Sequence, residues 1–389
     1  MIRQCFLCTS DVEPVFAVTW ALPGLDAAEI GFSVCPNCGS VCQSPSIPPE
    51  DMMKYYSSQA VYTNPGRKGG PSATKVLDVN EQVRFVVRGI GKLPDSVLQI
   101  GSSDGYTLSR FREAGVKKVH GVEPGNASIE MAQNLYGIEC THCSAEEFET
   151  DDRFELILMT HVLEHLYDPQ RVLEKCRRIQ ETWAEGFIYV EVPLLAPNSQ
   201  LCPGFFSFEH INYYTRENLL ESLIESGYSP VSVVEHYNSN IAPLIGVLAS
   251  TQEQNHLQIS RTSPAWSRNR LEEYRKRELG YWQGCLNELA STLDGAKRIF
   301  LWGAGIHTSQ LIANTNLLDR YDISGLVDSS PLKWGGQQGQ WLCRNPAHIE
   351  WKSGDAIVIS SYASEDEIYR SLSDLRDVGC KTLRFHSRP

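Results

Sequence analysis

The sequence predicts an α/β protein in which helices cover both faces of mainly parallel sheets. From residue 97, short apolar runs alternate with amphipathic segments, and glycine turns at 101–105 and 303–305 each follow an apolar run. Two Cys-x-x-Cys pairs near the N-terminus predict a small metal-binding domain ahead of the first sheet. The expected divisions are a zinc-binding domain with a linker or lid at 1–75, a nucleotide-binding core at 76–250, and a linking helix with a second small α/β domain at 251–389.

Length and charge restrict the classes of function. A chain of 389 residues exceeds what one hydrophobic core usually covers. The formal net charge of −12 leaves no broad basic surface for a phosphate backbone, so we expect no nucleic-acid partner. The longest strongly apolar stretch, 241–249, is too short to span a bilayer, and the first residues lack an apolar signal region. We therefore expect a cytoplasmic protein with no membrane partner, and we make no prediction of its oligomeric state.

Four of the twelve cysteines are ordered in pairs. Cys5 and Cys8 form one pair, and Cys35 and Cys38 form the other. Each pair turns two thiolates toward one point, so two pairs complete a tetrahedral sulfur site that suits structural zinc. Scattered structural cysteines and iron in the same geometry are the alternatives. The following segment, 43–72, is rich in Pro, Gly, Ser and Tyr, and we expect an irregular linker or lid there.

The middle of the chain predicts a parallel sheet whose ligand lies beyond the carboxyl ends of the strands. Residues 96–115 indicate a strand, a glycine turn and a helix. The further expected strands are 117–124, 137–143, 154–162, 186–193, 229–237 and 241–250, and the further expected helices are 126–135, 169–179 and 216–227.

The glycine turn GSSDG, residues 101–105, fits many nucleotide folds. Glu123 narrows the choice of ligand, because it lies 22 residues after Gly101 at the end of the next strand. A carboxylate in that place can accept hydrogen bonds from both ribose hydroxyls. The spacings typical of a pyrophosphate loop and of a phosphate loop are both missing. A ligand with a ribose and no phosphate fits best.

The segment HVLEH, residues 161–165, has the spacing of the inverted zinc peptidases, in which two helical histidines bind zinc. That motif needs one long helix through both histidines. Here an apolar strand leads directly into the segment, and Asp168 and Pro169 start a new element soon after it. We interpret the segment as a strand-to-turn region at the rim of a ligand pocket. We expect His161 to face cofactor or substrate, and a structural hydrogen-bonding role is the alternative for His165.

The last third of the chain repeats the pattern of strand, glycine turn and helix. Asp328 lies 25 residues after Gly303, near where a dinucleotide fold places its ribose acid, but Thr308 occupies the third glycine position. A glycine turn kept for tight packing is therefore favoured over an NAD site. The expected elements are a long helix at 271–293, a strand, turn and helix over 297–312, strands at 323–330, 355–361 and 381–385, and a helix at 365–379.

Residues 97–250 resemble the class I S-adenosylmethionine-dependent methyltransferases. VLQIGSSDG is similar to their first motif, VHGVEP to their second-strand acid, CSAEEF to their adenine-contacting loop, and FELILMTHVLEHLYDP to their fourth strand and the turn after it. Ser144 and Glu155 stand where that family often has Asp. The resemblance implies a Rossmann-like core of seven strands. The cofactor-binding residues that it implies are Gly101, Ser102, Asp104, Gly105, Tyr106, Glu123, Pro124, Ser144, Ala145, Glu146 and Thr160.

The order of zinc knuckles, methyltransferase core and small Rossmann-like domain resembles bacterial sugar C-methyltransferases that act on nucleotide-linked 4-keto sugars. Their chemistry lies in a Tyr-His-Glu-His segment; here Glu209 and His210 match, whereas Ser207 and Phe208 replace the first two residues. The resemblance implies S-adenosylmethionine and zinc as cofactors and methylation of the carbon next to the ketone.

We expect His210 to be the base and Glu209 to orient it. Tyr213, Tyr55 and Tyr56 are expected to hydrogen-bond the sugar, and His161 is the second candidate for the base. The alternatives are O-methylation of a sugar hydroxyl and a non-catalytic scaffold that binds nucleotides.

Overall fold

The computed structural model describes residues 1–22, 25–58, 70–196, 201–202, 204–237, 242–253, 260–361 and 364–385. The chain divides into two compact units. The first consists of Met1–Val15 and Phe32–Asn269, and the second of Phe16–Gly31 and Arg270–Pro389. The three domains expected from the sequence stay a prediction. Among the described helices, none combines the length and the hydropathy that a membrane crossing needs.

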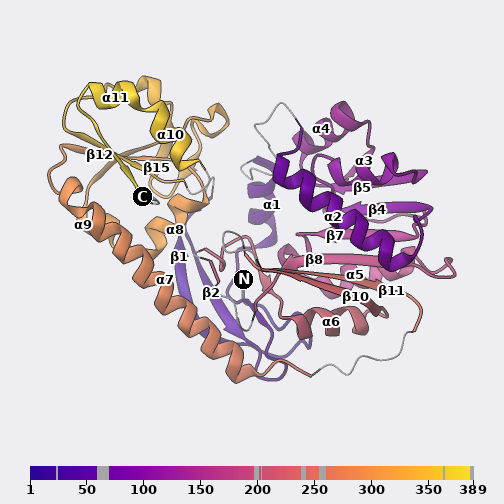
Figure 1. Ribbon diagram of the computed structural model, residues 1–389. Coiled ribbons are helices and arrows are strands. Elements are labelled where there is room, and N and C mark those ends of the chain that lie inside the picture. Colours follow the sequence, from indigo (N-terminus) through magenta and orange to yellow (C-terminus); the bar gives the residue numbers. More distant parts are fainter. Residues whose placement is uncertain are drawn as a thin grey trace. The chain divides into compact units, whose positions relative to one another are not determined.

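A seven-stranded sheet forms the centre of the first unit, in the order β10-β11-β8-β7-β4-β5-β6 (Figure 1). The strands from β4 to β8 run parallel, and β11 is antiparallel to both of its neighbours. Since β5 and β6 extend the sheet on one side of β4 and β7 and β8 on the other, a topological switch point lies between β4 and β7. The predicted fold class is confirmed. The strands are β4 (Ser96–Ile100), β5 (Lys118–Glu123), β6 (Cys140–His142), β7 (Leu156–Thr160), β8 (Phe187–Pro193), β10 (Ser229–His236) and β11 (Leu244–Ser250).

Helices cover both faces of this sheet, so its central strands are almost wholly buried. Leu98 and Ile157 belong to the apolar layer under α5 and α6, whereas their neighbours Val97 and Leu156 belong to the layer under α2, α3 and α4. Figure 1 shows these two groups of helices on opposite sides of the strands. The helices are α2 (Ala73–Ile90), α3 (Tyr106–Glu113), α4 (Asn126–Tyr136), α5 (Pro169–Ile179) and α6 (Arg216–Glu225).

The expectation of an irregular linker at 43–72 is wrong for part of that segment, because α1 (Pro49–Ser58) lies within it. Proline at the first helical position costs no hydrogen bond, and Glu50 and Asp51 place negative charge in the first turn. Met52 and Tyr55 anchor the helix by burial. Residues 59–69 of the expected linker lie outside the described residues.

A second, four-stranded sheet has the order β1-β2-β3-β9. In it, β3 pairs with β9, so that Val41 lies opposite Tyr213 and Cys42 opposite Asn212. This pairing joins the cysteine region to the segment that follows β8. The strands are β1 (Glu13–Trp20), β2 (Ala28–Val34), β3 (Val41–Gln43) and β9 (Asn212–Tyr213).

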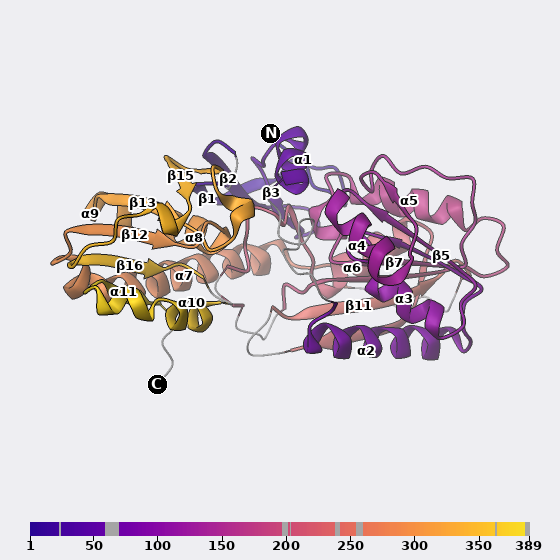
Figure 2. The ribbon, with the colours of Figure 1, turned by 90° about the horizontal axis from the view of Figure 1, so that it is seen from above.

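The second unit contains a six-stranded sheet in the order β14-β15-β13-β12-β16-β17. Figure 2 shows α10 and α11 running along one side of β16. The long predicted helix of this region is present as α7 (Pro264–Leu293), and the helix expected at 365–379 is divided at Leu372. The other elements are β12 (Arg298–Trp302), α8 (Ile306–Asn314), α9 (Leu317–Arg320), β13 (Ile323–Val327), β14 (Gln337–Gln338), β15 (Trp341–Arg344), β16 (Asp355–Ile359), α10 (Glu365–Ser371), α11 (Ser373–Asp377) and β17 (Lys381–Arg384).

Candidate active site

A cavity with a volume of ≈ 770 Å³ lies at the carboxyl ends of β4, β5 and β7 in the first unit. Asp104, Gly105, Tyr106 and Tyr213 are not among its lining residues. The sequence-predicted residues that line it are Gly101, Ser102, Glu123, Pro124, Ser144, Ala145, Glu146, Thr160, His161, Glu209 and His210. The cavity thus brings together most of the predicted cofactor residues and three of the four predicted catalytic residues.

The loop after β4 requires glycine at its first position. Gly101 has φ 71°, and a Cβ there would lie 2.4 Å from Cγ2 of Val162. The backbone N–H groups of Gly101 and Ser102 donate to the Val122 carbonyl oxygen at 2.8 and 3.0 Å, which folds the loop onto β5. Asp104 supports the loop from behind, because its Oδ1 accepts from Lys75 Nζ at 2.8 Å and from the backbone N–H of Tyr106 at 3.2 Å.

Glu123 is held in place by two backbone donors. Its Oε2 accepts from Ser103 N and its Oε1 from Gly125 N, both at 2.9 Å. Burial raises the pKa of this carboxyl group, and the two hydrogen bonds offset part of that rise. A carboxylate oxygen has more than one lone pair, so both oxygens can still accept from a ligand hydroxyl in the cavity.

His161 stands at the end of β7, where its φ is 56° and its N–H donates to the Glu191 carbonyl oxygen at 2.9 Å. Its side chain is 48% exposed, and it lies between two buried carboxylates. Nδ1 is 3.5 Å from Oε1 of Glu164, and Nε2 is 3.6 Å from Oε1 of Glu191. Desolvation lowers the pKa of His161, but the two carboxylates outweigh it, so the pKa is raised.

Glu164 lies on the short 3-10 helix Leu163–His165, and its side chain is only 1% exposed. Neither carboxylate oxygen has a hydrogen-bond partner among the described residues. The His165 Nε2 atom is 3.9 Å from Oε1 of Glu164. Burial alone would raise the pKa of Glu164, but the imidazoles of His161, His165 and His210 hold it at about 2.

His210 is half-buried beside His165, with their ring centroids 4.9 Å apart. Its Nδ1 has no hydrogen-bond partner in the described part of the chain. Burial, followed by the neighbouring His165, lowers the pKa of His210 to about 3. Gln43 fixes this turn from β3, since its Nε2 donates to the carbonyl oxygens of Ser207, Phe208 and His210 at 2.8, 3.2 and 2.9 Å.

The tyrosines differ in where they lie. Tyr56 lines the cavity, and its hydroxyl is 2.9 Å from Nδ1 of His165. Tyr55 is buried and donates to Oε1 of Glu209 at 2.9 Å. Tyr213 is also buried and donates to the Ser207 carbonyl oxygen at 3.0 Å.

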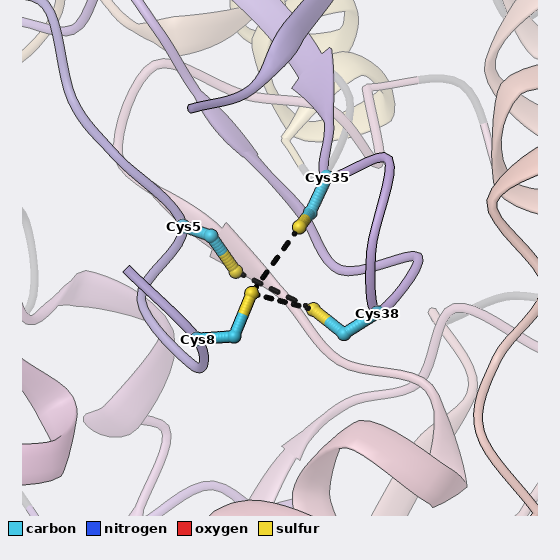
Figure 3. A group of neighbouring side chains, drawn as sticks. All are labelled: Cys5, Cys8, Cys35 and Cys38. Carbon is cyan, nitrogen blue, oxygen red and sulfur yellow. Dashed lines mark hydrogen bonds between the residues drawn. The ribbon is translucent and has the colours of Figure 1, made fainter. Parts of the chain in front are cut away.

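The four paired cysteines converge on one point (Figure 3). The sulfur of Cys5 is 3.5 Å from that of Cys38, and the sulfur of Cys8 is 3.4 Å from that of Cys35 and 3.6 Å from that of Cys38. A tetrahedral zinc site with Zn–S bonds of about 2.3 Å needs sulfurs about 3.8 Å apart. The four residues therefore have the donor set and nearly the spacing of such a site.

The two cysteine turns share one backbone pattern. Cys5 N–H donates to Ser10 O and Thr9 N–H to Cys5 O; in the second turn, Cys35 N–H donates to the carbonyl oxygen of residue 40 and the N–H of residue 39 to Cys35 O. Thr9 and Gly39 both have positive φ, 57° and 69°. Because the same turn occurs twice, each cysteine pair directs its two sulfur atoms toward one point.

Sequence reasoning missed several residues of the cavity wall. Met52 and Met53 come from α1, Lys75 comes from α2, and Gln99 comes from within β4. Lys75 and the methionines lie outside the quoted motifs, in or near a segment expected to be irregular. Gln99 could have been identified as a site residue from the sequence, because it is a polar residue inside an otherwise apolar strand.

A family model described as a methyltransferase domain matches residues 79–233. A search of curated proteins found no match. The solved structure of 1,6-didemethyltoxoflavin-N1-methyltransferase from Burkholderia thailandensis, with bound 1,6-didemethyltoxoflavin and S-adenosylhomocysteine, is similar at 16% identity and a TM-score of 0.44, over 60% of this chain and 100% of that chain. N-methyltransferase NodS from Bradyrhizobium japonicum WM9, in complex with S-adenosylhomocysteine, is similar at 13% identity and a TM-score of 0.40, over 52% and 98%.

The family match covers the glycine loop, Glu123 and the segment after β7, which are among the parts that line the cavity. The match supports an enzyme over the alternative of a scaffold without catalytic function. Residues 79–233 match a methyltransferase domain, and the protein is accordingly an enzyme, a methyltransferase.

Proposed function

We propose that the protein transfers the methyl group of S-adenosylmethionine to a nucleotide-linked sugar, at the carbon next to a 4-keto group. One observation carries this proposal: the glycine loop with Glu123 and the group of His161, His165 and His210 line the same cavity. At ≈ 770 Å³ this cavity is of the size that small-molecule sites have. A methyl donor and an acceptor can therefore lie in contact within it.

The donor would lie over the loop at Gly101, with its ribose hydroxyls on Glu123. Two features support this placement: Gly101 and Ser102 line the cavity, and the Glu123 carboxylate is already oriented by Ser103 and Gly125. The adenine would lie near Ser144 and Ala145, which line the cavity and follow β6.

In the reaction, a histidine takes the proton from the carbon next to the ketone, and the C–H electron pair forms an enolate. The enolate carbon then bonds to the methyl carbon while the S–CH₃ bond breaks and its electron pair stays on sulfur. The products are the methylated ketone, S-adenosylhomocysteine and a protonated imidazole. The sulfonium supplies the electrophile, so the protein has to align the acceptor and remove one proton.

His161 is the proton acceptor in this proposal, although His210 was the first choice from the sequence. Two observations support His161: half of its side chain is exposed, and carboxylates flank both ring nitrogens at 3.5 and 3.6 Å. Carboxylates at these distances stabilise, through their charge, the imidazolium that forms. His210 remains the second candidate.

The charge of the cavity limits which part of the substrate enters it. Its described lining has one lysine, Lys75, whose ammonium is paired with Asp104. It has five carboxylate side chains, from Glu123, Glu146, Glu147, Glu164 and Glu209. A diphosphate would be repelled there, so we propose that the sugar ring enters and the nucleotide stays outside. O-methylation is the second candidate, since the same base can deprotonate a hydroxyl.

We also propose that Cys5, Cys8, Cys35 and Cys38 bind one structural zinc ion. Four protein ligands leave no open position for substrate, so this zinc would hold the cysteine turns together and take no part in methyl transfer.

The test is a panel of nucleotide-linked sugars, each with and without a 4-keto group, incubated with S-adenosylmethionine and analysed by mass spectrometry. We expect a gain of one methyl group with a keto substrate, and deuterium exchange at the neighbouring carbon when the cofactor is left out. Methylation of the non-keto sugars alone would favour O-methylation. No methylation of any nucleotide-linked sugar would overturn the substrate class.

A further inference from the structure

We propose that Glu164, His165 and His210 bind a divalent transition-metal cation in the wall of the cavity, separate from the cysteine site. All three residues line the cavity, and they come from two segments, the turn after β7 and the turn before β9. One ligand atom from each lies within 4.8 Å of the other two. Ligands at about 2.1 Å from a cation are about 3.0–4.2 Å apart, so small side-chain movements would complete the site.

The burial of Glu164 is the first independent support. Its side chain is 1% exposed, yet neither oxygen has a hydrogen-bond partner among the described residues. The nearest ring nitrogens, Nδ1 of His161 and Nε2 of His165, are 3.5 and 3.9 Å from Oε1 of Glu164, which is beyond good hydrogen-bonding distance. A buried carboxylate is costly unless it is paired, and a cation between Glu164 and the two histidines would pair it.

The ring of His165 is oriented as that of a metal ligand. Its Nδ1 is 2.9 Å from the Glu209 carbonyl oxygen, and a carbonyl oxygen can only accept. Nδ1 therefore carries the proton, and the lone pair is on Nε2, the nitrogen on the side of Glu164. A hydrogen bond from the second ring nitrogen to a backbone carbonyl is the usual support of a metal-binding histidine.

His210 supplies the second nitrogen. Its Nδ1 is buried and has no partner in the described part of the chain, although Gln43 holds the backbone of the same turn rigidly. A buried ring nitrogen without a partner loses its hydration and gains nothing in return. Coordination of a cation would satisfy it.

Two imidazoles and one carboxylate suit zinc, manganese or iron in the divalent state, and they suit magnesium and calcium poorly. Three protein ligands leave coordination positions open toward the cavity. This part of the inference rests on the proposed function: a keto oxygen of the substrate would occupy an open position. The cation would then stabilise the enolate oxygen as His161 removes the neighbouring proton.

The experiment titrates the full-length protein, prepared with one zinc ion per chain, with Mn²⁺ and follows free Mn²⁺ by electron paramagnetic resonance. Manganese binds thiolates weakly and does not displace zinc from a four-cysteine site. We expect one Mn²⁺ per chain in the wild type. Glu164→Gln, His165→Gln and His210→Gln should each weaken this binding at least tenfold. The matched controls Glu130→Gln and His236→Gln, which lie on exposed positions of α4 and β10, should bind like the wild type.

Calorimetry with S-adenosylmethionine on the same variants shows whether each is folded. If the wild type binds no Mn²⁺, or if all three variants bind it as the wild type does while still binding the cofactor, the cation site is refuted. Methyl transfer is measured separately. Mn²⁺ binding without methylation of any nucleotide-linked sugar would overturn the substrate proposal and leave the cation site standing.

Discussion

At the residue scale, the Glu123 carboxylate can accept hydrogen bonds from the backbone and from a ligand at the same time. It accepts hydrogen bonds from Ser103 and Gly125, which shape the loops on either side of the cofactor site. It also faces the cavity, where a ribose would supply two further donors. Hydrogen bonds to charged groups contribute roughly 1.5–3 kcal/mol each, so in the proposed placement this one side chain would have a large share in cofactor affinity.

Replacing Glu123 by Ala should therefore lower the affinity for S-adenosylmethionine at least tenfold, measured by calorimetry. Glu130→Ala on the exposed face of α4 is the control and should bind normally. Unchanged affinity in Glu123→Ala would contradict the placement of the ribose.

The histidines can be separated by substitution. His161→Asn should leave cofactor affinity intact and reduce turnover by roughly 10²–10⁴, the usual contribution of a positioned base. His210→Asn should also lower turnover, but excess Mn²⁺ should restore part of it, because the proposed loss there is of a cation ligand. Normal turnover in His161→Asn, together with a Mn²⁺-independent loss in His210→Asn, would return the role of base to His210.

At the scale of elements, the proposed zinc ion would hold the two cysteine turns together. Cys35→Ser removes one of four ligands, so zinc content should fall well below one ion per chain and thermal unfolding should occur at a lower temperature. Cys285→Ser on α7 is the matched control and should keep its zinc. Full zinc content in Cys35→Ser would show that the metal does not depend on this cysteine.

The strands that build the cavity could be predicted because each is a short apolar run bounded by turn residues, as at Leu98 and Ile157. The helix α1 could not, because Pro48 and Pro49 suggest irregular structure when the partner that buries Tyr55 is unknown. The environment of His210 could not be predicted from the sequence either. It depends on Gln43, 167 residues earlier, and this contact follows from the pairing of β3 with β9, for which the sequence has no local signal.

At the scale of the whole molecule, the second unit has the outline of a dinucleotide fold in which the acid at the ribose position, Asp328, is paired with a lysine and with two backbone N–H groups. Asp328 accepts from Ala304 N at 2.7 Å, from Ser330 N at 2.8 Å and from Lys333 Nζ at 3.0 Å. Thr308 fills the place of the third glycine and bonds to Ser360 at 2.7 Å. This agrees with the expectation that the glycine turn serves packing.

NAD should accordingly give no thermal stabilisation of the protein, whereas S-adenosylmethionine should raise the unfolding temperature through the first unit. Both are measured in one thermal shift series, with adenosine as the control for weak nucleoside binding. Stabilisation by NAD that Asp328→Ala abolishes would reverse the interpretation of the second unit.

The division of the chain has a consequence for how the protein is made. Residues 16–31 belong to the second unit, where Ser309 donates to the Ala21 carbonyl oxygen, but they lie between the two cysteine pairs of the first. During synthesis the ribosome releases this hairpin early, and the strands that complete its unit emerge more than 200 residues later. The cysteine pairs could close on the proposed zinc ion in the meantime. The hairpin would then stay attached to the cysteine turns, without the rest of its unit, until translation ends.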